Sequence, residues 1–77
     1  MNVFIAYGFV PYEGNQTLTI ADNYGQAMDR CQKYHQAVLA DENFELPIHY
    51  MAYSIATWTV GALKPDAVHH VTPEELK

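Results

Sequence analysis

Apolar residues occupy both faces of the first segment of the chain, in a pattern typical of a β-strand. Val3–Val10 consists mainly of β-branched and aromatic residues, the types that are enriched in strands. Odd and even positions form two faces, and both are apolar: Val3, Ile5, Tyr7 and Phe9 on one, and Phe4, Ala6, Gly8 and Val10 on the other. We therefore expect a strand that is covered on both sides, or covered on one side and used for contact on the other.

A second, shorter strand is expected after a turn. Residues 11–16 have the Pro, Gly and Asn content of a turn. Thr17–Ala21 then alternates, with Leu18 and Ile20 directed inward and the threonines directed outward. The two runs together predict a β-hairpin.

The next segment carries apolar side chains at spacings of three and four residues, which is the period of an α-helix. This stripe consists of Tyr24, Ala27, Met28, Cys31, Tyr34 and Val38. Asp22 or Asn23 is expected to cap the helix, because either side chain can accept a hydrogen bond from a free amide of the first turn. We predict a helix from about Tyr24 to about Ala40.

Two interpretations fit Tyr50–Val60. Its even and odd positions form two alternating sets, as along a strand, and residues 55–60 are of strongly β type, which favours a long strand. A helix that starts at Pro47 is the other interpretation, because proline is favoured at the first helical position. Four residues have the helical spacing that this requires: Ile48, Met51, Ala52 and Ile55. We favour the strand.

After Gly61 the sequence predicts an irregular C-terminal tail, residues 61–77, in which the capping-box pattern of residues 72–75 can start a last helical turn. The order of elements predicts an α+β fold of ββαβ type in a single domain, 1–77: a three-stranded antiparallel-type sheet with one helix packed on one face. One helix covers only one face. The other face must therefore be covered by a second copy, by the C-terminal tail or by a partner.

The charge of the chain bears on the kind of partner. Nine Asp and Glu residues against four Lys and Arg residues give a net charge of −5. Such a charge disfavours direct nucleic-acid binding, which depends on Lys and Arg displacing counterions, and favours a protein partner with a basic surface.

The single cysteine, Cys31, allows no intrachain disulfide and suits a cytoplasmic protein. Neither a secretory signal nor an apolar run of the roughly 20 residues that cross a membrane is expected.

Large aromatic side chains are predicted to be anchors for contact with a protein partner. Sheets that stack nucleic-acid bases on such side chains are flanked by Lys and Arg, which the predicted sheet lacks. The anchors are Tyr7, Tyr50, Tyr53 and Trp58. Carboxylates are expected to steer a basic partner toward them, and these are Glu13, Asp41, Glu42 and Glu45. If the acidic residues converged in space they would imitate a phosphate backbone, although solubility alone already requires a net charge of about 2–8 in magnitude.

Cysteine and histidine offer an alternative, a small metal- or ligand-binding domain. Cys31 and His35 lie one turn apart on the predicted helix, and His69 and His70 are adjacent in the tail. No Cys-x-x-Cys or His-Glu-x-x-His spacing supports a zinc site. A thiol in the middle of an apolar helical stripe is usually inert, so Cys31 is not expected to be a nucleophile. No catalytic residue, metal or cofactor is predicted.

Most of the chain resembles a known class of proteins, through Val3–Tyr7, Thr17–Ile20, Tyr24–Tyr34 and Tyr53–Val60. In their order and residue composition these segments resemble the small α+β accessory proteins of phages and mobile elements. This class includes anti-CRISPR proteins, anti-restriction proteins and RNA polymerase inhibitors. The resemblance implies a stoichiometric inhibitor of a host protein and transfers no individual residue. We therefore expect a non-enzymatic, cytoplasmic homodimer that binds and blocks a host protein, such as a nucleic-acid-processing complex. A structural subunit of an assembly is a further alternative.

Overall fold

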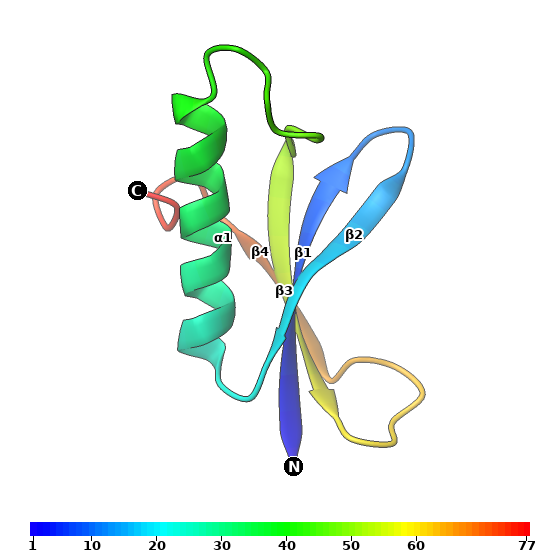
Figure 1. The fold of residues 1–77 in the computed structure, drawn as a ribbon. Helices are drawn as coiled ribbons and strands as arrows, with labels where there is room; N and C mark the ends of the chain where they lie inside the picture. The colour runs from blue at the N-terminus through cyan, green and yellow to red at the C-terminus, as the bar shows by residue number, and fades with distance from the viewer.

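The computed structural model describes residues 1–77 and contains one helix and four strands (Figure 1). In chain order the elements are β1 (Asn2–Val10), β2 (Gly14–Ala21), α1 (Tyr24–Ala40), β3 (Ala52–Thr59) and β4 (Ala67–Val71). The strands form one antiparallel sheet in the order β2-β1-β3-β4. The predicted α+β class is confirmed. The predicted three-stranded ββαβ sheet is wrong, because the sheet has a fourth strand after β3.

Strand β4 lies within residues 61–77, for which the sequence predicts an irregular tail. It pairs with β3 from Ala67 opposite Thr57 to Val71 opposite Tyr53. The strand has only five residues, two of them adjacent histidines, and so it carries no alternation that a local pattern could reveal. Hydrogen bonds to β3 make this segment a strand, and tertiary contact overrides a weak local preference.

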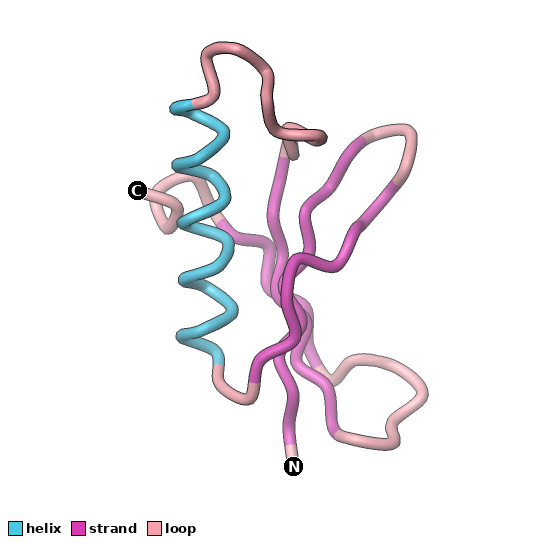
Figure 2. The backbone as a smooth tube through the Cα atoms, viewed as in Figure 1, coloured by secondary structure: helices cyan, strands magenta, loops and turns pink.

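Helix α1 has the predicted bounds and begins at one of the two predicted caps (Figure 2). The Asn23 side chain accepts a hydrogen bond from the Gln26 amide at 2.8 Å, which satisfies one of the free donors of the first turn. Ala27 and Cys31 are fully buried on the side that faces the sheet. The predicted apolar stripe is therefore the packing face of the helix.

The strand interpretation of Tyr50–Val60 is confirmed, and no helix forms at Pro47. Strand β3 begins at Ala52, two residues later than the alternation indicates. Just before it, the Met51 amide donates a hydrogen bond to the Phe9 carbonyl at 2.9 Å. Strand β3 is hydrogen-bonded to β1 on one side and β4 on the other, so its backbone groups are satisfied without a helix.

A β-bulge in β2 reverses the expected direction of one side chain. The register with β1 shifts between Ala6 and Tyr7, which leaves Leu18 without a partner. One extra residue moves the following side chains to the opposite face of the sheet. Leu18 packs against the core as predicted, but Ile20 lies opposite Ile5 on the outer face and is 63% exposed. The prediction that Ile20 points inward is wrong for this reason.

The core lies between α1 and one face of the sheet. It contains eight residues: Ala6, Ala21, Ala27, Cys31, Tyr53, Ile55, Val71 and Leu76. Four of these are alanine or cysteine, and only 12 of the 77 residues are buried. A core of this size leaves much apolar surface outside it, as expected for a short chain.

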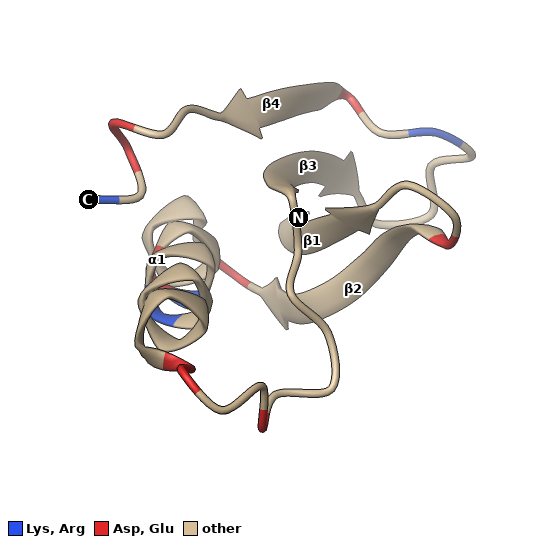
Figure 3. Ribbon diagram, turned by 90° about the horizontal axis from the view of Figure 1, so that it is seen from above, with Lys and Arg blue, Asp and Glu red and all other residues tan.

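The C-terminal residues pack on the same side of the sheet as α1 (Figure 3). The predicted capping box is present: the Thr72 amide donates to Glu75 Oε1 at 3.0 Å, and the Glu75 amide donates to Thr72 Oγ1 at 3.3 Å. The turn places Leu76 in the core, and Gln32 Nε2 donates to the Glu75 carbonyl at 2.7 Å.

The opposite face of the sheet, called the open face below, has no element of the chain over it (Figure 3). Strand alternation and pairing place on it the odd residues of β1, the even residues of β3 and β4, and part of β2. Its large apolar side chains are Val3, Ile5, Tyr7, Phe9, Ile20, Trp58 and Val68. Within the predicted tail, residues 67–71 are part of the sheet and residues 72–77 lie on its helix side, so neither segment covers this face.

Candidate protein-binding site

The four predicted aromatic anchors do not form one surface patch. Tyr7 and Trp58 lie on the open face, whereas Tyr53 points to the helix side, is 3% exposed and belongs to the core. Burial raises the pKa of Tyr53 to about 12, and its hydroxyl group has no hydrogen-bond partner. Tyr53 is therefore not available as a contact anchor, and the prediction is wrong at this residue.

Tyr50 is also held within the chain. Its ring packs between the helix and the sheet, with its centroid 5.1 Å from that of Tyr34 and 6.1 Å from that of Tyr53. Its hydroxyl group donates a hydrogen bond to Gln16 Oε1 at 2.9 Å, and burial raises its pKa. Tyr50 thus ties the start of β3 to β2, and its ring is engaged inside the molecule.

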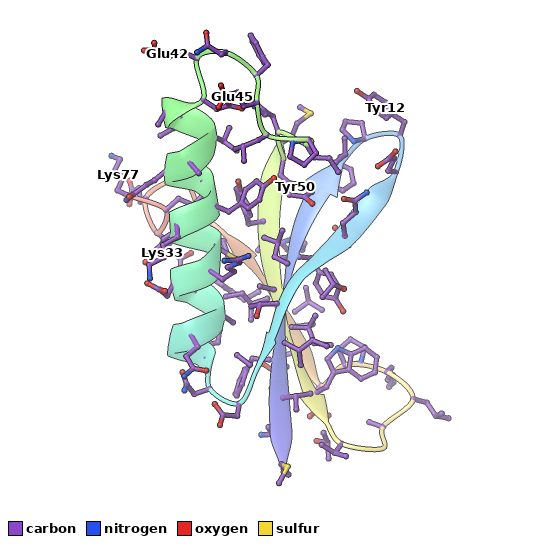
Figure 4. All side chains as sticks on the ribbon, in the orientation of Figure 1. Tyr12, Lys33, Glu42, Glu45, Tyr50 and Lys77 are labelled. Atoms are coloured by element: carbon purple, nitrogen blue, oxygen red, sulfur yellow. The ribbon has the colours of Figure 1, made fainter.

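Two connections meet at one end of the molecule, called the loop end below: residues 11–13 between β1 and β2, and residues 41–51 between α1 and β3 (Figure 1). A shallow pocket of about 300 Å³ lies between the two connections. It is lined by Val10, Tyr12, Glu13, Pro47, Ile48 and His49. Figure 4 shows Tyr12, Glu42 and Glu45 at this end, with Tyr50 between the helix and the sheet.

Asp41 organises the longer connection. Its carboxylate accepts hydrogen bonds from the Glu45 amide at 2.8 Å and the Leu46 amide at 2.9 Å, and its Oδ2 atom lies 2.7 Å from His49 Nε2. The side chain is only 7% exposed. The Leu46 amide above all, and then His49, hold the pKa of Asp41 below its ordinary value. Asp41 is therefore a structural residue of the loop, and its role in steering a partner stays a prediction.

Phe44 is the side chain that this loop presents. It is 78% exposed, although its backbone is in the left-handed region with φ at 53°, which is unfavourable for a residue with a large side chain. Its ring stacks on His49 with a centroid distance of 5.4 Å. Tyr12, on the other connection, is 89% exposed. Sequence reasoning missed both residues, although an aromatic residue within a polar loop was the available signal.

The acidic residues occupy separate places around the molecule (Figure 3). Three of the four predicted to steer a partner, Glu13, Glu42 and Glu45, are exposed at the loop end. Glu75 lies elsewhere, where its Oε1 atom is 2.9 Å from His69 Nε2. A linear row of carboxylates that would imitate a phosphate backbone is therefore not formed, and the three glutamates of the loop end are divided between its two connections.

The four candidate cysteine and histidine ligands are dispersed. Cys31 is completely buried, and burial raises the pKa of its thiol to about 11. His69 lies on the helix side of β4 beside Glu75, whereas His70 lies on the open face opposite Ser54. No three His, Cys, Asp or Glu side chains come close enough to hold a metal ion. The four side chains therefore do not form a common binding site on the surface.

The lowered pKa of Asp41 leads to a prediction about pH. A carboxyl group with a depressed pKa in the folded state contributes stability above its ordinary value of 3.8 and loses it as the pH falls through the folded value. We expect Asp41→Asn to lower the free energy of unfolding at neutral pH and to differ less from wild type in acid. Urea denaturation at several pH values measures this difference. Glu42→Gln, at an exposed side chain, is the control and should change stability little. A deficit of Asp41→Asn that is equal at all pH values would contradict the assignment.

No helix of the protein has both the length and the apolar character to pass through a membrane. Comparisons of the chain with protein-family models, with curated proteins and with solved structures found no match. Function must therefore be inferred from the loop end and the open face themselves.

Proposed function

We propose that this protein is a non-enzymatic inhibitor that binds a larger protein through its loop end and blocks a basic surface of that partner. The observation that carries the proposal is Phe44, an exposed aromatic side chain on a strained backbone that the surrounding loop holds in place. A residue in the left-handed region costs roughly 1–2 kcal/mol relative to the right-handed one. Strain of this kind is characteristic of functional sites.

The neighbours of Phe44 support a contact role. Asp41 accepts the amides of Glu45 and Leu46, and His49 stacks on the Phe44 ring, so the loop has its shape before any partner arrives. A preorganised loop loses less conformational entropy on binding. Exposed Phe44 and Tyr12 are aromatic residues of the kind enriched at the centres of protein interfaces.

Charge at the loop end supports a basic partner. Residues 11–13 and 41–51 contain Glu13, Glu42 and Glu45 and no Lys or Arg. Local negative charge accelerates association with a positively charged surface and selects against acidic partners. Proteins that process nucleic acids carry basic grooves for the phosphate backbone. The proposed targets are therefore cytoplasmic complexes of this kind, such as a CRISPR effector, a restriction enzyme or an RNA polymerase, as for the phage-encoded inhibitors that the sequence resembles.

A capture experiment with a matched control tests the proposal. Wild-type protein is immobilised and exposed to lysate of the source cells, and retained proteins are identified and then purified. We expect one stoichiometric partner whose own activity falls when the inhibitor is added. The variant Tyr12→Ala/Phe44→Ala should lose this partner. Leu63→Ala removes an equally exposed side chain from the β3–β4 loop at the opposite end (Figure 1) and should retain it.

The variant Phe44→Gly separates binding from folding. Glycine adopts a positive φ without strain, so the free energy of unfolding should stay within about 1 kcal/mol of wild type. Affinity for the captured partner should fall about 30-fold, the effect of about 2 kcal/mol at an interface hot spot. Full affinity in this variant, or a partner that wild type and the double variant retain equally, would refute the loop end as the binding surface.

A further inference from the structure

The open face contains no Asp, Glu, Lys or Arg, although it includes His70. None of the nine acidic and four basic residues of the chain lies on the odd positions of β1, the even positions of β3 and β4, or the outer positions of β2. All charged side chains are therefore on the helix, in the connections and at the ends of the strands. An uncharged sheet face offers no complement to a basic partner, which distinguishes it from the loop end.

The relief of the open face is made of a ridge and a groove side by side. The central strand β3 presents small side chains there, Ala52, Ser54 and Ala56, and the last two are nearly buried although no element covers them. Larger side chains of the neighbouring strands stand beside them, Phe9 of β1 and Val68 of β4. The resulting groove has a volume of about 360 Å³. A row of large side chains on β1 thus runs next to a row of small ones on β3.

We propose that a second copy of the chain covers the open face, so that the protein is a two-fold symmetric dimer with the sheets packed face to face and the helices outside. In a two-fold interface the same patch meets itself, so it must carry both a projection and a matching depression. The β1 ridge and the β3 groove meet this requirement, since the ridge around Phe9 of one copy fits the groove over Ala52 and Ser54 of the other. Sheets pack in this way about 10 Å apart in β-sandwiches.

Charge favours a second copy over other occupants. Each chain has a net charge of −5, and two copies would repel each other through almost any other surface. The open face is the surface on which two copies can meet without bringing carboxylates together. Repulsion between the remaining charges is weakened by salt, so the dimer should be favoured by rising ionic strength, whereas binding of a basic partner at the loop end should weaken.

The area of the open face is sufficient for a dimer. The four strands have 9, 8, 8 and 5 residues, and at ~3.3 Å per residue and about 4.8 Å between strands they make a face of roughly 475 Å². Two copies would bury about 1,000 Å², the least that a specific interface requires. The edges of the sheet are poorer contacts, because β4 has five residues and β2 contains the bulge at Leu18, both of which disfavour pairing between edges.

Trp58 makes the proposal directly measurable. It is the only tryptophan and lies on the open face. Its Nε1 atom is buried in the single chain, but the residue is partly exposed, so its fluorescence should change as dilution dissociates the dimer. Sedimentation velocity of the untagged protein should give a mass of twice 8.7 kDa at high concentration. Ile20→Glu should raise the dissociation constant at least about 100-fold, because it places an unpaired carboxylate of each copy in the interface. Since Ile20 is exposed in the single chain, this variant should keep its fold.

Leu39→Glu is the matched control, because it makes the same change at an exposed position on the helix and should leave the dimer intact. Phe44→Ala should also leave it intact, which separates this proposal from that of the loop end. A wild-type mass of 8.7 kDa at every concentration, or an Ile20→Glu variant that dimerises as well as Leu39→Glu, would overturn the proposal. If the wild-type chain is monomeric and Ile20→Glu prevents binding of the captured partner, the open face binds that partner and not a second copy.

Discussion

Replacing Gly8 with alanine is expected to destabilise the protein by about 1–3 kcal/mol, the usual cost of overpacking. Gly8 lies on the helix side of β1, and the ring of Tyr50 covers it: a Cβ atom at this position would lie 2.7 Å from the Tyr50 Cδ2 atom and still closer to Cγ. The ring cannot easily move, since its hydroxyl donates a hydrogen bond to Gln16 and the ring packs against those of Tyr34 and Tyr53. A small domain rarely has more than about 3–5 kcal/mol in total, so the loss would be a large fraction.

A double-mutant cycle tests the physical cause. In a Tyr50→Ala background the clash is absent, so Gly8→Ala should cost less than about 0.5 kcal/mol, and the difference is the coupling between the two residues. Gly25→Ala is the matched control: a Cβ atom there meets only Asn23 Oδ1, at 3.4 Å, and alanine is preferred in helices. Chemical denaturation of the four proteins of the cycle and the control gives the energies. An equal cost of Gly8→Ala in both backgrounds would mean that the ring is not the obstacle.

Ile55→Ala is expected to have the largest effect, a loss of about 2–5 kcal/mol. Ile55 lies on the helix side of β3, is 1% exposed and is the largest fully buried side chain. Four of the other seven core residues are alanine or cysteine, and such short side chains cannot extend into the space that Ile55 would leave. Much of the variant should therefore be unfolded at room temperature, which circular dichroism and urea titration would detect.

A graded series distinguishes loss of packing from a general weakness of β3. Ile55→Val removes one methylene group and should cost about 0.5–1.5 kcal/mol. Val60→Ala, at an exposed residue just beyond the same strand, should change stability by no more than about 0.5 kcal/mol. If Ile55→Ala and Val60→Ala lost similar amounts, the core described above would not be what stabilises the sheet.

Local interactions explain which elements were predictable. Helix α1 was found with its bounds because its stripe and its Asn23 cap involve residues within four positions of one another. The two faces of β1 and the strand predicted over Tyr50–Val60, which the structure has at Ala52–Thr59, followed from alternation and residue type, which need only neighbouring residues. The capping box at Thr72 and Glu75 is equally local.

Contacts between distant segments decided the functional surfaces. The Leu18 bulge, which turns Ile20 onto the open face, depends on the register with β1 and not on the residues of β2 alone. The orientation of Tyr53 also depends on a distant segment. Its odd position in β3 puts it on the other face of the strand from Trp58, but the sequence does not show which of the two faces α1 covers. Aromatic type was therefore insufficient to identify an accessible anchor.

Periodicity and helix capping involve residues that are close together in the sequence. The order of the residues was therefore enough to predict the helix, the hairpin and the central strand. It also predicted an apolar sheet face that one helix cannot cover. Strand β4, the loop built around Asp41 and the exposure of Phe44 arise from hydrogen bonds and packing that exist only once the sheet has formed. A local pattern of residue types cannot predict such contacts, because each contact depends on the position of another segment of the chain in the folded protein.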